Sequence, residues 1–253
     1  GEIGEVIDIV KKYGHEKAMT EKRSELIEEL ADVLMYFNDI MLCYGITEQE
    51  LKDSYVQKFK KNETIYCEGE KATHLMCLLS GKVKIYKEGV GGRSQIIRVI
   101  KDKEYFAYRA YFAGEDFVTA AAAFEPCTIC LIPMTAIVQL LRENSELGMF
   151  FIRQLSIDLG IADERTVNLT QKHIRGRLAE SLLFLKDTYG VDKKTNTIDI
   201  QLSRKDLADL SNMTTSNAIR TLTNFANEGL IEIHGRKISI LSEERMRRIS
   251  LIG

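Results

Sequence analysis

The sequence predicts an α+β protein in which an N-terminal helical segment precedes a small jelly-roll-like β-barrel, a long helix and a C-terminal winged helix-turn-helix. Two observations support this fold class. The apolar residues follow a helical period over residues 1–60, a strand period over residues 61–132 and a helical period again from Met134. The chain then ends in two short helical patterns followed by a hairpin pattern. Its 253 residues are enough for several compact units.

The first predicted unit, residues 1–60, consists of helices. Apolar residues at helical spacing precede a turn at Gly14, and a second helix covers Thr20–Cys43. Thr47 with Glu50 forms a capping box, in which each side chain satisfies a backbone amide at the helix start. We therefore expect a third helix that extends to about residue 60.

The second predicted unit, residues 61–143, contains a β-barrel. Short apolar runs alternate with turn residues such as Ser80-Gly81, and this spacing is typical of a small sandwich or barrel. Pro133 ends the last run, because proline cannot donate to a central ladder. The expected strands are Thr64–Cys67, Leu75–Leu79, Lys82–Tyr86, Gln95–Ile100, Phe117–Ala120 and Cys127–Ile132.

The third predicted unit, residues 144–169, is one long helix with an apolar stripe. Its spacing of three and four residues suits a seam between two helices and predicts a homodimer. The alternative is an ordinary long helix that packs on its own barrel. The stripe consists of Leu147, Phe151, Leu155, Leu159, Ala162 and Thr166.

The fourth predicted unit, residues 170–253, has the spacing of a winged helix-turn-helix. Ser203 and Thr214 are good N-caps for two successive short helices, because their hydroxyls accept from backbone amides. The hairpin after them is the expected wing. The predicted elements are helix Gln171–Tyr189, strand Thr197–Leu202, helices to Leu210 and over 214–225, and strands Leu230–His234 and Lys237–Leu241.

The second of these short helices presents polar side chains on one face. Thr215, Ser216, Asn217 and Arg220 offer hydrogen bonds to base edges and phosphates in a major groove. Ser203 and Thr214 add helix N-termini, which favour phosphate, so all six residues are candidate DNA contacts. A helical hairpin without a DNA role is the alternative, and the adjoining wing disfavours it.

Charge is distributed unevenly along the chain, although the net charge is only −2. Residues 1–55 carry 6 basic and 13 acidic side chains, whereas residues 164–253 carry 15 and 11. The basic tail suits double-stranded DNA as a partner. Five cysteines are too few for a disulfide scaffold, and we find no membrane span or signal peptide, so we expect a cytoplasmic protein. Cys127 and Cys130 would point to opposite faces of their strand.

Three motifs give the region from Lys60 to Leu241 a resemblance to Crp/Fnr-type transcription regulators. These are Cys77–Tyr86 in the barrel, Leu169–Ala179 after the long helix, and Leu202–Leu222. The resemblance implies a cyclic-nucleotide-binding-type barrel and a homodimer that reads a two-fold-related DNA site. It also implies an unknown small-molecule effector, and RNA polymerase as a further partner.

The barrel departs from the family where a cyclic nucleotide would bind. The family uses a glutamate for the ribose and an arginine for the phosphate, and this chain has Ala107 and Phe117 there. A buried phosphate without a cation is costly, so we predict no tight binding of cyclic AMP. Arg109 and Thr119 are the remaining effector-pocket candidates.

Two carboxylate pairs lie in the acidic N-terminal segment. Glu2 with Glu5, and Glu29 with Asp32, are each three residues apart on one helix face, and four such oxygen donors would suit Mg²⁺. The alternative is two solvated acidic faces. Residues 1–60 resemble MazG-like nucleotide pyrophosphohydrolases, which implies that these four residues are metal ligands. That family has a further helix before the first pair. An Mg²⁺-dependent pyrophosphohydrolase is thus the alternative function.

Overall fold

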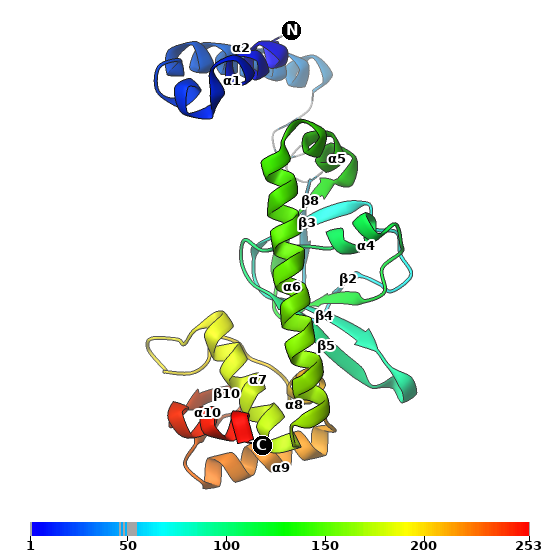
Figure 1. Cartoon of the computed structure of the whole chain (residues 1–253), viewed down its shortest axis with the longest axis vertical. Helices are drawn as coiled ribbons and strands as arrows, with labels where there is room; N and C mark the ends of the chain where they lie inside the picture. Colours follow the sequence, from blue (N-terminus) through cyan, green and yellow to red (C-terminus); the bar gives the residue numbers. More distant parts are fainter. Residues whose placement is uncertain (1, 46, 48, 50–54, 253) are drawn as a thin grey trace. The chain divides into compact units, whose positions relative to one another are not determined.

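The computed structural model describes residues 2–45, 47, 49 and 55–252. The chain consists of two compact units, Gly1–Tyr55 and Val56–Gly253 (Figure 1). The boundary comes before the expected residue 60, because Val56–Phe59 form a strand of the barrel. The predicted helix over 47–60 is therefore wrong at its C-terminal end. Residues 50–54 of that prediction lie outside the described residues.

The first unit is a pair of helices, α1 (Glu2–Met19) and α2 (Arg23–Tyr44). Gly14 has φ 76° and ψ 161°, a conformation that side chains with a Cβ rarely adopt, and it kinks α1 at the predicted turn. Ala18 is buried, whereas Ile27 and Leu34 of α2 are exposed within this unit. The helical character of the segment is confirmed.

The barrel consists of two four-stranded sheets, which confirms the predicted sandwich class. One sheet has the order β1-β8-β3-β6 and the other β2-β7-β4-β5, with antiparallel pairs throughout. The strands are β1 (Val56–Phe59), β2 (Thr64–Tyr66), β3 (His74–Ser80), β4 (Val83–Glu88), β5 (Ser94–Ile100), β6 (Tyr105–Phe106), β7 (Ala120–Ala123) and β8 (Cys127–Pro133).

Side chains of the barrel strands alternate between core and surface. In β8, Cys127 and Ile129 are buried in the barrel core, whereas Cys130 is partly exposed. This confirms that Cys127 and Cys130 face opposite sides. The core is packed to van der Waals contact: a Cβ placed on Gly81 would lie 2.6 Å from the Cys127 Cβ.

The connection between the fifth and seventh strands differs from the prediction. Phe117–Ala120 is not a strand over its length, because β7 begins at Ala120 and Phe117 packs its ring into the core. The two-residue strand β6 and the short helix α4 (Tyr108–Ala113) occupy the preceding stretch. Their pattern of aromatic residues has neither a strand nor a helix period, so periodicity missed them.

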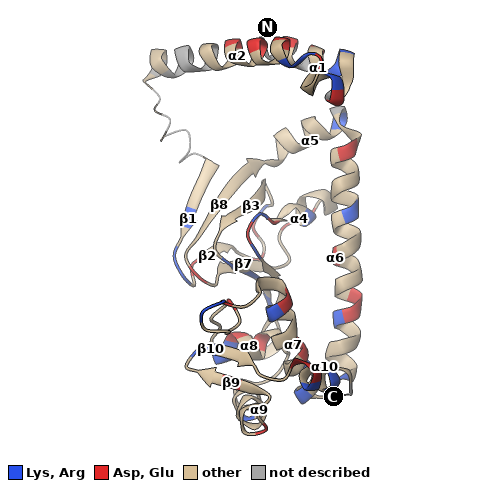
Figure 2. Ribbon diagram, turned by 90° about the vertical axis from the view of Figure 1, so that its left-hand side faces the viewer, with Lys and Arg blue, Asp and Glu red and all other residues tan. Residues whose placement is uncertain are grey.

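A long helix, α6 (Ser145–Gln171), runs beside the barrel after the short helix α5 (Met134–Glu143) (Figure 2). Asn144 caps α6 by accepting from the Leu147 amide at 3.2 Å. Phe151, Leu147 and Leu155 pack on Leu75 and Tyr108 of the barrel. The first half of the predicted dimer stripe therefore belongs to a core within the chain.

The C-terminal part is a helical domain with a two-stranded wing. The predicted strand Thr197–Leu202 is wrong, because the described residues there form only an isolated bridge between Val191 and Ile198. The domain core includes Ile96 and Phe124 of the barrel, so the domain packs against the barrel of its own chain. Its elements are α7 (Ile174–Tyr189), α8 (Arg204–Leu210), α9 (Thr215–Asn227), β9 (Ile231–His234), β10 (Lys237–Ile240) and α10 (Glu243–Ile252).

Candidate nucleic-acid interface and effector cavity

Helices α8 and α9 form the predicted helix-turn-helix. Leu207 and Leu210 of α8 and Leu222 and Phe225 of α9 are buried in one core. The turn between them contains Asn212, whose φ of 50° places it in the left-handed region that asparagine tolerates. The opposite face of α9 is therefore turned away from the protein.

The exposed face of α9 carries the predicted base-contact residues. Thr214 caps the helix by accepting from the Asn217 amide at 3.3 Å. Arg220 Nη2 donates to the side-chain oxygen of Asn217 at 3.0 Å, so these two side chains lie together on one face. Thr215, Ser216 and Arg220 are exposed. Five of the six candidates thus share the N-terminal half of α9, and their contacts with DNA stay predictions.

The sixth candidate, Ser203, is engaged within the protein. Its hydroxyl accepts from the Asp206 amide at 3.0 Å, and the Ser203 backbone amide donates to the Asp206 carboxylate at 3.3 Å, which completes a capping box at the start of α8. The hydroxyl also donates to this carboxylate at 2.6 Å. Lys84 of the barrel strand β4 contacts the same carboxylate at 2.5 Å. Burial raises the pKa of Asp206, but the hydrogen bonds from Lys84 and Ser203 outweigh burial and lower it. Ser203 positions α8 against the barrel.

Two arginines that sequence analysis did not single out stabilise the arrangement of α8, α9 and the wing. The exposed face of α9 and the tip of the wing are together called the reading surface below. Arg204 Nη2 donates to the carbonyl of Gly235 at 2.8 Å and so fixes the wing turn to α8. Arg175 of α7 forms two hydrogen bonds with the Glu228 carboxylate at the end of α9, and its guanidinium lies over the Phe225 ring. Arg236, at the tip of the wing, is exposed and can face a phosphate.

A second exposed feature is an apolar surface along α6. Met149, Ile152 and Leu159 have 56%, 57% and 63% of their surface exposed in the single chain, and Val167 is also exposed. These residues do not pack on the core that Phe151 joins. An apolar helix face of this length is unusual on a surface that contacts only water.

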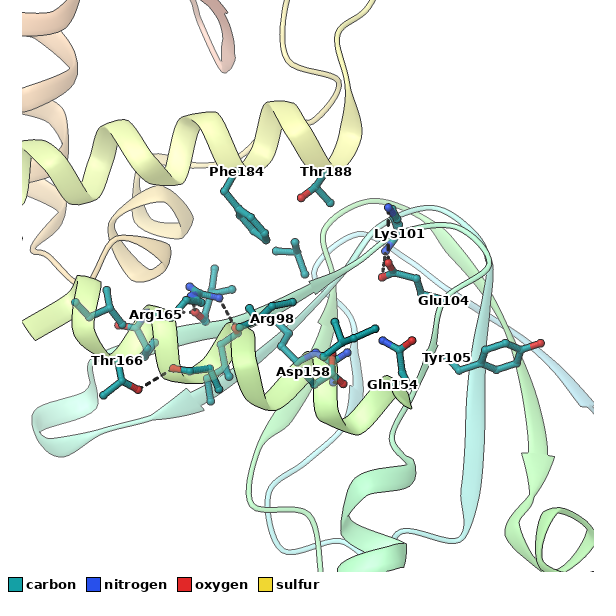
Figure 3. A pocket seen from close by; sticks show the side chains of 18 of the residues that line it. Arg98, Lys101, Glu104, Tyr105, Gln154, Asp158, Arg165, Thr166, Phe184 and Thr188 are labelled. Carbon is teal, nitrogen blue, oxygen red and sulfur yellow. Dashed lines mark hydrogen bonds and ion pairs between the residues drawn. The ribbon is translucent and has the colours of Figure 1, made fainter. Parts of the chain in front are cut away.

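A cavity of about 620 Å³ lies between β5, α6 and α7 (Figure 3). Phe150, Ile157 and Ile161 of α6 and Phe184 of α7 give it apolar walls. Its polar lining is mainly charged and comes from both the barrel and the helices. The labelled polar residues are Arg98, Lys101, Glu104, Tyr105, Gln154, Asp158, Arg165, Thr166 and Thr188.

Arg165 joins the walls of this cavity. Its guanidinium donates to the carbonyls of Ile96 and Ile97 on β5, and at 3.5 Å to the carbonyl of Leu210 at the end of α8. It also lies 5.8 Å from the centre of the Phe184 ring. Burial lowers the pKa of Arg165 below its ordinary value, and the negative charge of Glu180 offsets part of this shift. One side chain of α6 therefore contacts the barrel, α7 and the helix-turn-helix.

Arg98 of β5, Asp158 of α6 and Tyr108 of α4 form a partly buried polar cluster. Arg98 contacts the Asp158 carboxylate at 2.8 Å. The Tyr108 hydroxyl is buried without a hydrogen-bond partner among the described residues. Burial raises the pKa of Tyr108 to about 12, and Asp158 adds to the rise. An unsatisfied buried hydroxyl beside an ion pair is a place where a polar ligand atom or a water gains a hydrogen bond.

The segment 105–120, called the cassette below, holds the effector candidates predicted from sequence. Arg109 is exposed and pairs with Glu115 at 2.5 Å. Thr119 is half-buried and hydrogen-bonds the hydroxyl of Tyr66. Neither lines the 620 Å³ cavity, so the structure does not bring them together with it. Their role in effector binding stays a prediction.

The two positions that depart from cyclic-nucleotide-binding proteins are apolar in the structure as well. Phe117 is 6% exposed, and its ring stacks on Tyr66 with centroids 3.9 Å apart. Ala107 has φ 71° at the start of α4. An aromatic pair therefore fills the place predicted for the phosphate-binding arginine.

The N-terminal hairpin brings some predicted metal ligands near one another. Burial raises the pKa of Glu29, and a hydrogen bond and charge repulsion from Glu5, with repulsion from Asp32, raise it further. The side chain of Glu2 lies outside the described part of the structure. Among the side chains that are described, no group of three or more metal-ligating residues is arranged to hold a metal.

Comparison with protein families matches two regions of the chain. A cyclic nucleotide-binding domain covers residues 56–144, and a Crp-like helix-turn-helix domain covers residues 176–249. The global nitrogen regulator of Nostoc sp. is 28% identical over 188 residues, or 73% of this chain and 84% of that protein. A CRP-like cAMP-activated global transcriptional regulator of Mycobacterium tuberculosis is 22% identical over 191 residues, or 75% of this chain and 85% of its own.

Solved structures show the same fold. FixK2 from Bradyrhizobium japonicum superposes with a TM-score of 0.70 at 22% identity, covering 77% of this chain and 96% of its own. A CRP-family transcriptional regulator from Thermus thermophilus gives a TM-score of 0.67 at 24% identity, with coverage of 77% and 96%. Both family matches lie within residues 56–249. In the described residues, no helix is long and apolar enough to cross a membrane.

Proposed function

The chain is a transcription regulator of the Crp/Fnr type with a DNA-binding helix-turn-helix domain, and we propose that it reads a two-fold-related DNA site as a homodimer. The observation that carries the proposal is the exposed face of α9. There Arg220 and Asn217 lie together in the first turns of the helix, after its N-cap Thr214. A helix with this arrangement fits a major groove end-on. RNA polymerase stays a predicted further partner.

We assign separate roles to the polar side chains of the reading surface. Arg220 suits the two acceptors of a guanine, and Asn217 suits the donor and acceptor of an adenine. Thr214, Thr215 and Ser216 lie at the N-terminus of α9, where the helix dipole and free amides favour a phosphate. Under this assignment the first two residues select sequence, and the hydroxyl residues fix the position of the helix.

The exposed apolar face of α6 supports the homodimer. Crp/Fnr regulators act as dimers, and Met149, Ile152 and Leu159 would lose their water contact against the same helix of a second chain. We expect Leu159→Asp to separate the dimer, because a buried carboxylate at the seam is unpaired. Leu251→Asp, at an exposed site on α10, is the matched control. Sedimentation velocity distinguishes dimer from monomer, and an unchanged dimer in Leu159→Asp contradicts this interface.

The effector site that the structure favours is the cavity between β5, α6 and α7. Its walls combine apolar side chains with the cations Arg98 and Arg165 and would suit a small molecule with an apolar body and an anionic group. Such a group would compete with Asp158 for Arg98. Arg165 contacts the Leu210 carbonyl, so a ligand in the cavity can act on α8. Cyclic AMP is not the expected effector, since Phe117 fills the phosphate position. Calorimetry with cyclic AMP and a series of aromatic carboxylates tests both statements, and micromolar affinity for cyclic AMP contradicts the second.

DNA binding itself is tested by selecting genomic fragments on the purified chain. We expect recovered sites with two-fold symmetry and half-sites about one helical turn apart. Affinity should fall steeply with added salt, because phosphate contacts release counterions. Recovery of fragments without a shared symmetric sequence would contradict a dimeric reader.

The alternative predicted from the sequence, an Mg²⁺-dependent pyrophosphohydrolase in the N-terminal hairpin, has its own test, since Glu5 and Glu29 lie close together. Like charges that share a small volume are stabilised by a divalent cation. Incubation of the full chain with a panel of nucleoside triphosphates and Mg²⁺ should release pyrophosphate, and Glu29→Gln should abolish this release. Glu21→Gln, in the same hairpin, is the control. Absence of pyrophosphate with every nucleotide rejects this function and leaves DNA binding unaffected.

A further inference from the structure

Two cysteines lie directly opposite each other on neighbouring strands of the barrel. Cys77 of β3 and Cys130 of β8 are register partners in an antiparallel pair. Both side chains are partly exposed, and both lie on the face of the sheet that is turned away from the barrel core. The fold therefore places two thiols side by side, although 53 positions separate them in the sequence.

The spacing of opposite residues in an antiparallel pair suits a disulfide. Their Cα atoms are about 4.5–5.5 Å apart and their Cβ atoms are on the same face. Disulfides join Cα atoms that are about 4.4–6.8 Å apart, so the bond needs no large backbone movement. The two thiols also influence each other: burial raises the pKa of Cys77, and neighbouring Cys130 raises it further.

The other three cysteines lack such a register partner among the described residues. Cys127 is on β8 as well, but it faces the core, and Phe59 is opposite it on β1. The Cys127 side chain is buried in this core, so a peroxide in solution does not reach its thiol. Cys43 and Cys67 are exposed and lie outside the strand pairs that bring Cys77 and Cys130 together. The pair Cys77–Cys130 is thus distinguished by its register.

We propose that Cys77 and Cys130 form a reversible intramolecular disulfide when a hydroperoxide oxidises the barrel. One thiolate attacks a peroxide oxygen, the O–O bond breaks, and hydroxide leaves and is protonated to water. The resulting sulfenic acid is attacked by the second thiol, an S–S bond forms, the S–O bond breaks, and a second water leaves. Two thiols lose two electrons, hydrogen peroxide accepts them, and a dithiol reductant reverses the reaction.

The disulfide would act on the wall of the effector cavity. Tyr105 of β6 is the other register partner of Cys77, and its side chain interacts with the thiol. The Tyr105 ring packs edge-on against Phe150 of α6, with centroids 6.0 Å apart. Both aromatic residues line the cavity. Oxidation removes the thiol from Tyr105 and so changes the contact between β6 and α6.

Peptide mapping of the full chain tests the bond. The protein is treated with hydrogen peroxide, free thiols are blocked with iodoacetamide, and the digest is analysed without reduction. We expect one cross-linked peptide pair that joins Cys77 to Cys130, lighter by two hydrogens and lost on addition of dithiothreitol. Cys77→Ser and Cys130→Ser should each abolish it, whereas Cys67→Ser should retain it. Circular dichroism checks that the variants fold, and mapping of the wild-type chain does not depend on them.

The contradicting outcomes are equally definite. Cross-links through Cys43 or Cys67, a disulfide between two chains, a sulfinic acid, or two alkylated thiols after complete treatment each overturn the proposal. The coupling to Tyr105 has its own readout in fluorotyrosine NMR. The Tyr105 resonance, assigned with Tyr105→Phe, should shift on oxidation of wild type and stay unmoved in treated Cys130→Ser. An unmoved resonance in oxidised wild type overturns the coupling.

Discussion

The helix-turn-helix and the cassette use similar residue types in opposite ways. On α9, Arg220 is exposed and held beside Asn217, so its guanidinium remains available for a DNA base. In the cassette, Arg109 pairs with Glu115, and Phe117 closes the interior by stacking on Tyr66. From this contrast we predict that α9 contacts DNA, whereas the cassette does not bind a cyclic nucleotide. The cavity beside α6 offers a separate place for a ligand.

The largest expected effect comes from the core of the cassette. Phe117→Ala should lower the free energy of unfolding by about 3–5 kcal/mol, because a buried ring is lost and a cavity remains. Urea denaturation measures the change, and Phe112→Ala, at a 39% exposed ring in the same segment, should cost much less. If Phe117→Ala and Phe112→Ala lowered the free energy of unfolding equally, Phe117 would not be the residue that fills the barrel.

The next effect concerns the contact between the two regions. Arg165→Ala should cost about 1.5–3 kcal/mol, because three carbonyls lose a charged donor. Since two of these carbonyls belong to β5 and one to α8, thermal unfolding should also change from one transition to two. Arg153→Ala, at an exposed site on α6, is the control. A single transition in Arg165→Ala would indicate that other contacts couple the barrel to the helix-turn-helix.

A smaller effect is expected at the Lys84–Asp206 contact. Although burial opposes it, hydrogen bonding lowers the pKa of Asp206 in the folded chain. The stabilisation is therefore present above the unfolded pKa, about 3.9, and is lost as pH falls through the lower folded pKa. Asp206→Asn should cost about 1 kcal/mol at neutral pH and should flatten the acid dependence. The urea midpoints of wild type and Asp206→Asn, measured from neutral to acid pH, test this. A difference between the two midpoints that stays constant with pH would show that the interpretation is wrong.

The smallest effect is expected at Arg109. Its pair with Glu115 is about half exposed, and such surface pairs contribute about 0–1 kcal/mol. Arg109→Ala should therefore leave urea stability and DNA affinity nearly unchanged. If this variant kept its stability but its DNA affinity no longer changed with an effector, the effector site would lie in the cassette and not in the cavity.

Sequence patterns predicted the elements whose periods are long and regular. The stripe of α6 and the caps at Ser203 and Thr214 were readable, because helical spacing and N-cap chemistry are local. The strand β1 was missed, since the apolar residues of 56–59 also continue a helical pattern and only pairing with β8 decides between them. Thr197–Leu202 has strand alternation, but the described structure offers it no ladder.

The sites show the same division. The face of α9 follows from the sequence of one helix, so its residues could be named in advance. The cavity and the Cys77–Cys130 pair join segments that are far apart in the sequence, and no local pattern marks them. Arg204 was missed for the same reason, because its partner Gly235 lies across the domain.

If α9 reads base sequence in a two-fold site, the affinity of Arg220→Ala for systematic variants of the selected operator measures this directly. We predict a loss of about 1–3 kcal/mol on the wild-type site and relaxed preference at one base pair of each half-site. Arg236→Ala, at the wing tip, should instead weaken all sequences alike and reduce the salt slope by about one. If Arg220→Ala kept the wild-type preference at every base pair, Arg220 would not read the base sequence, and the assigned role of α9 would be wrong.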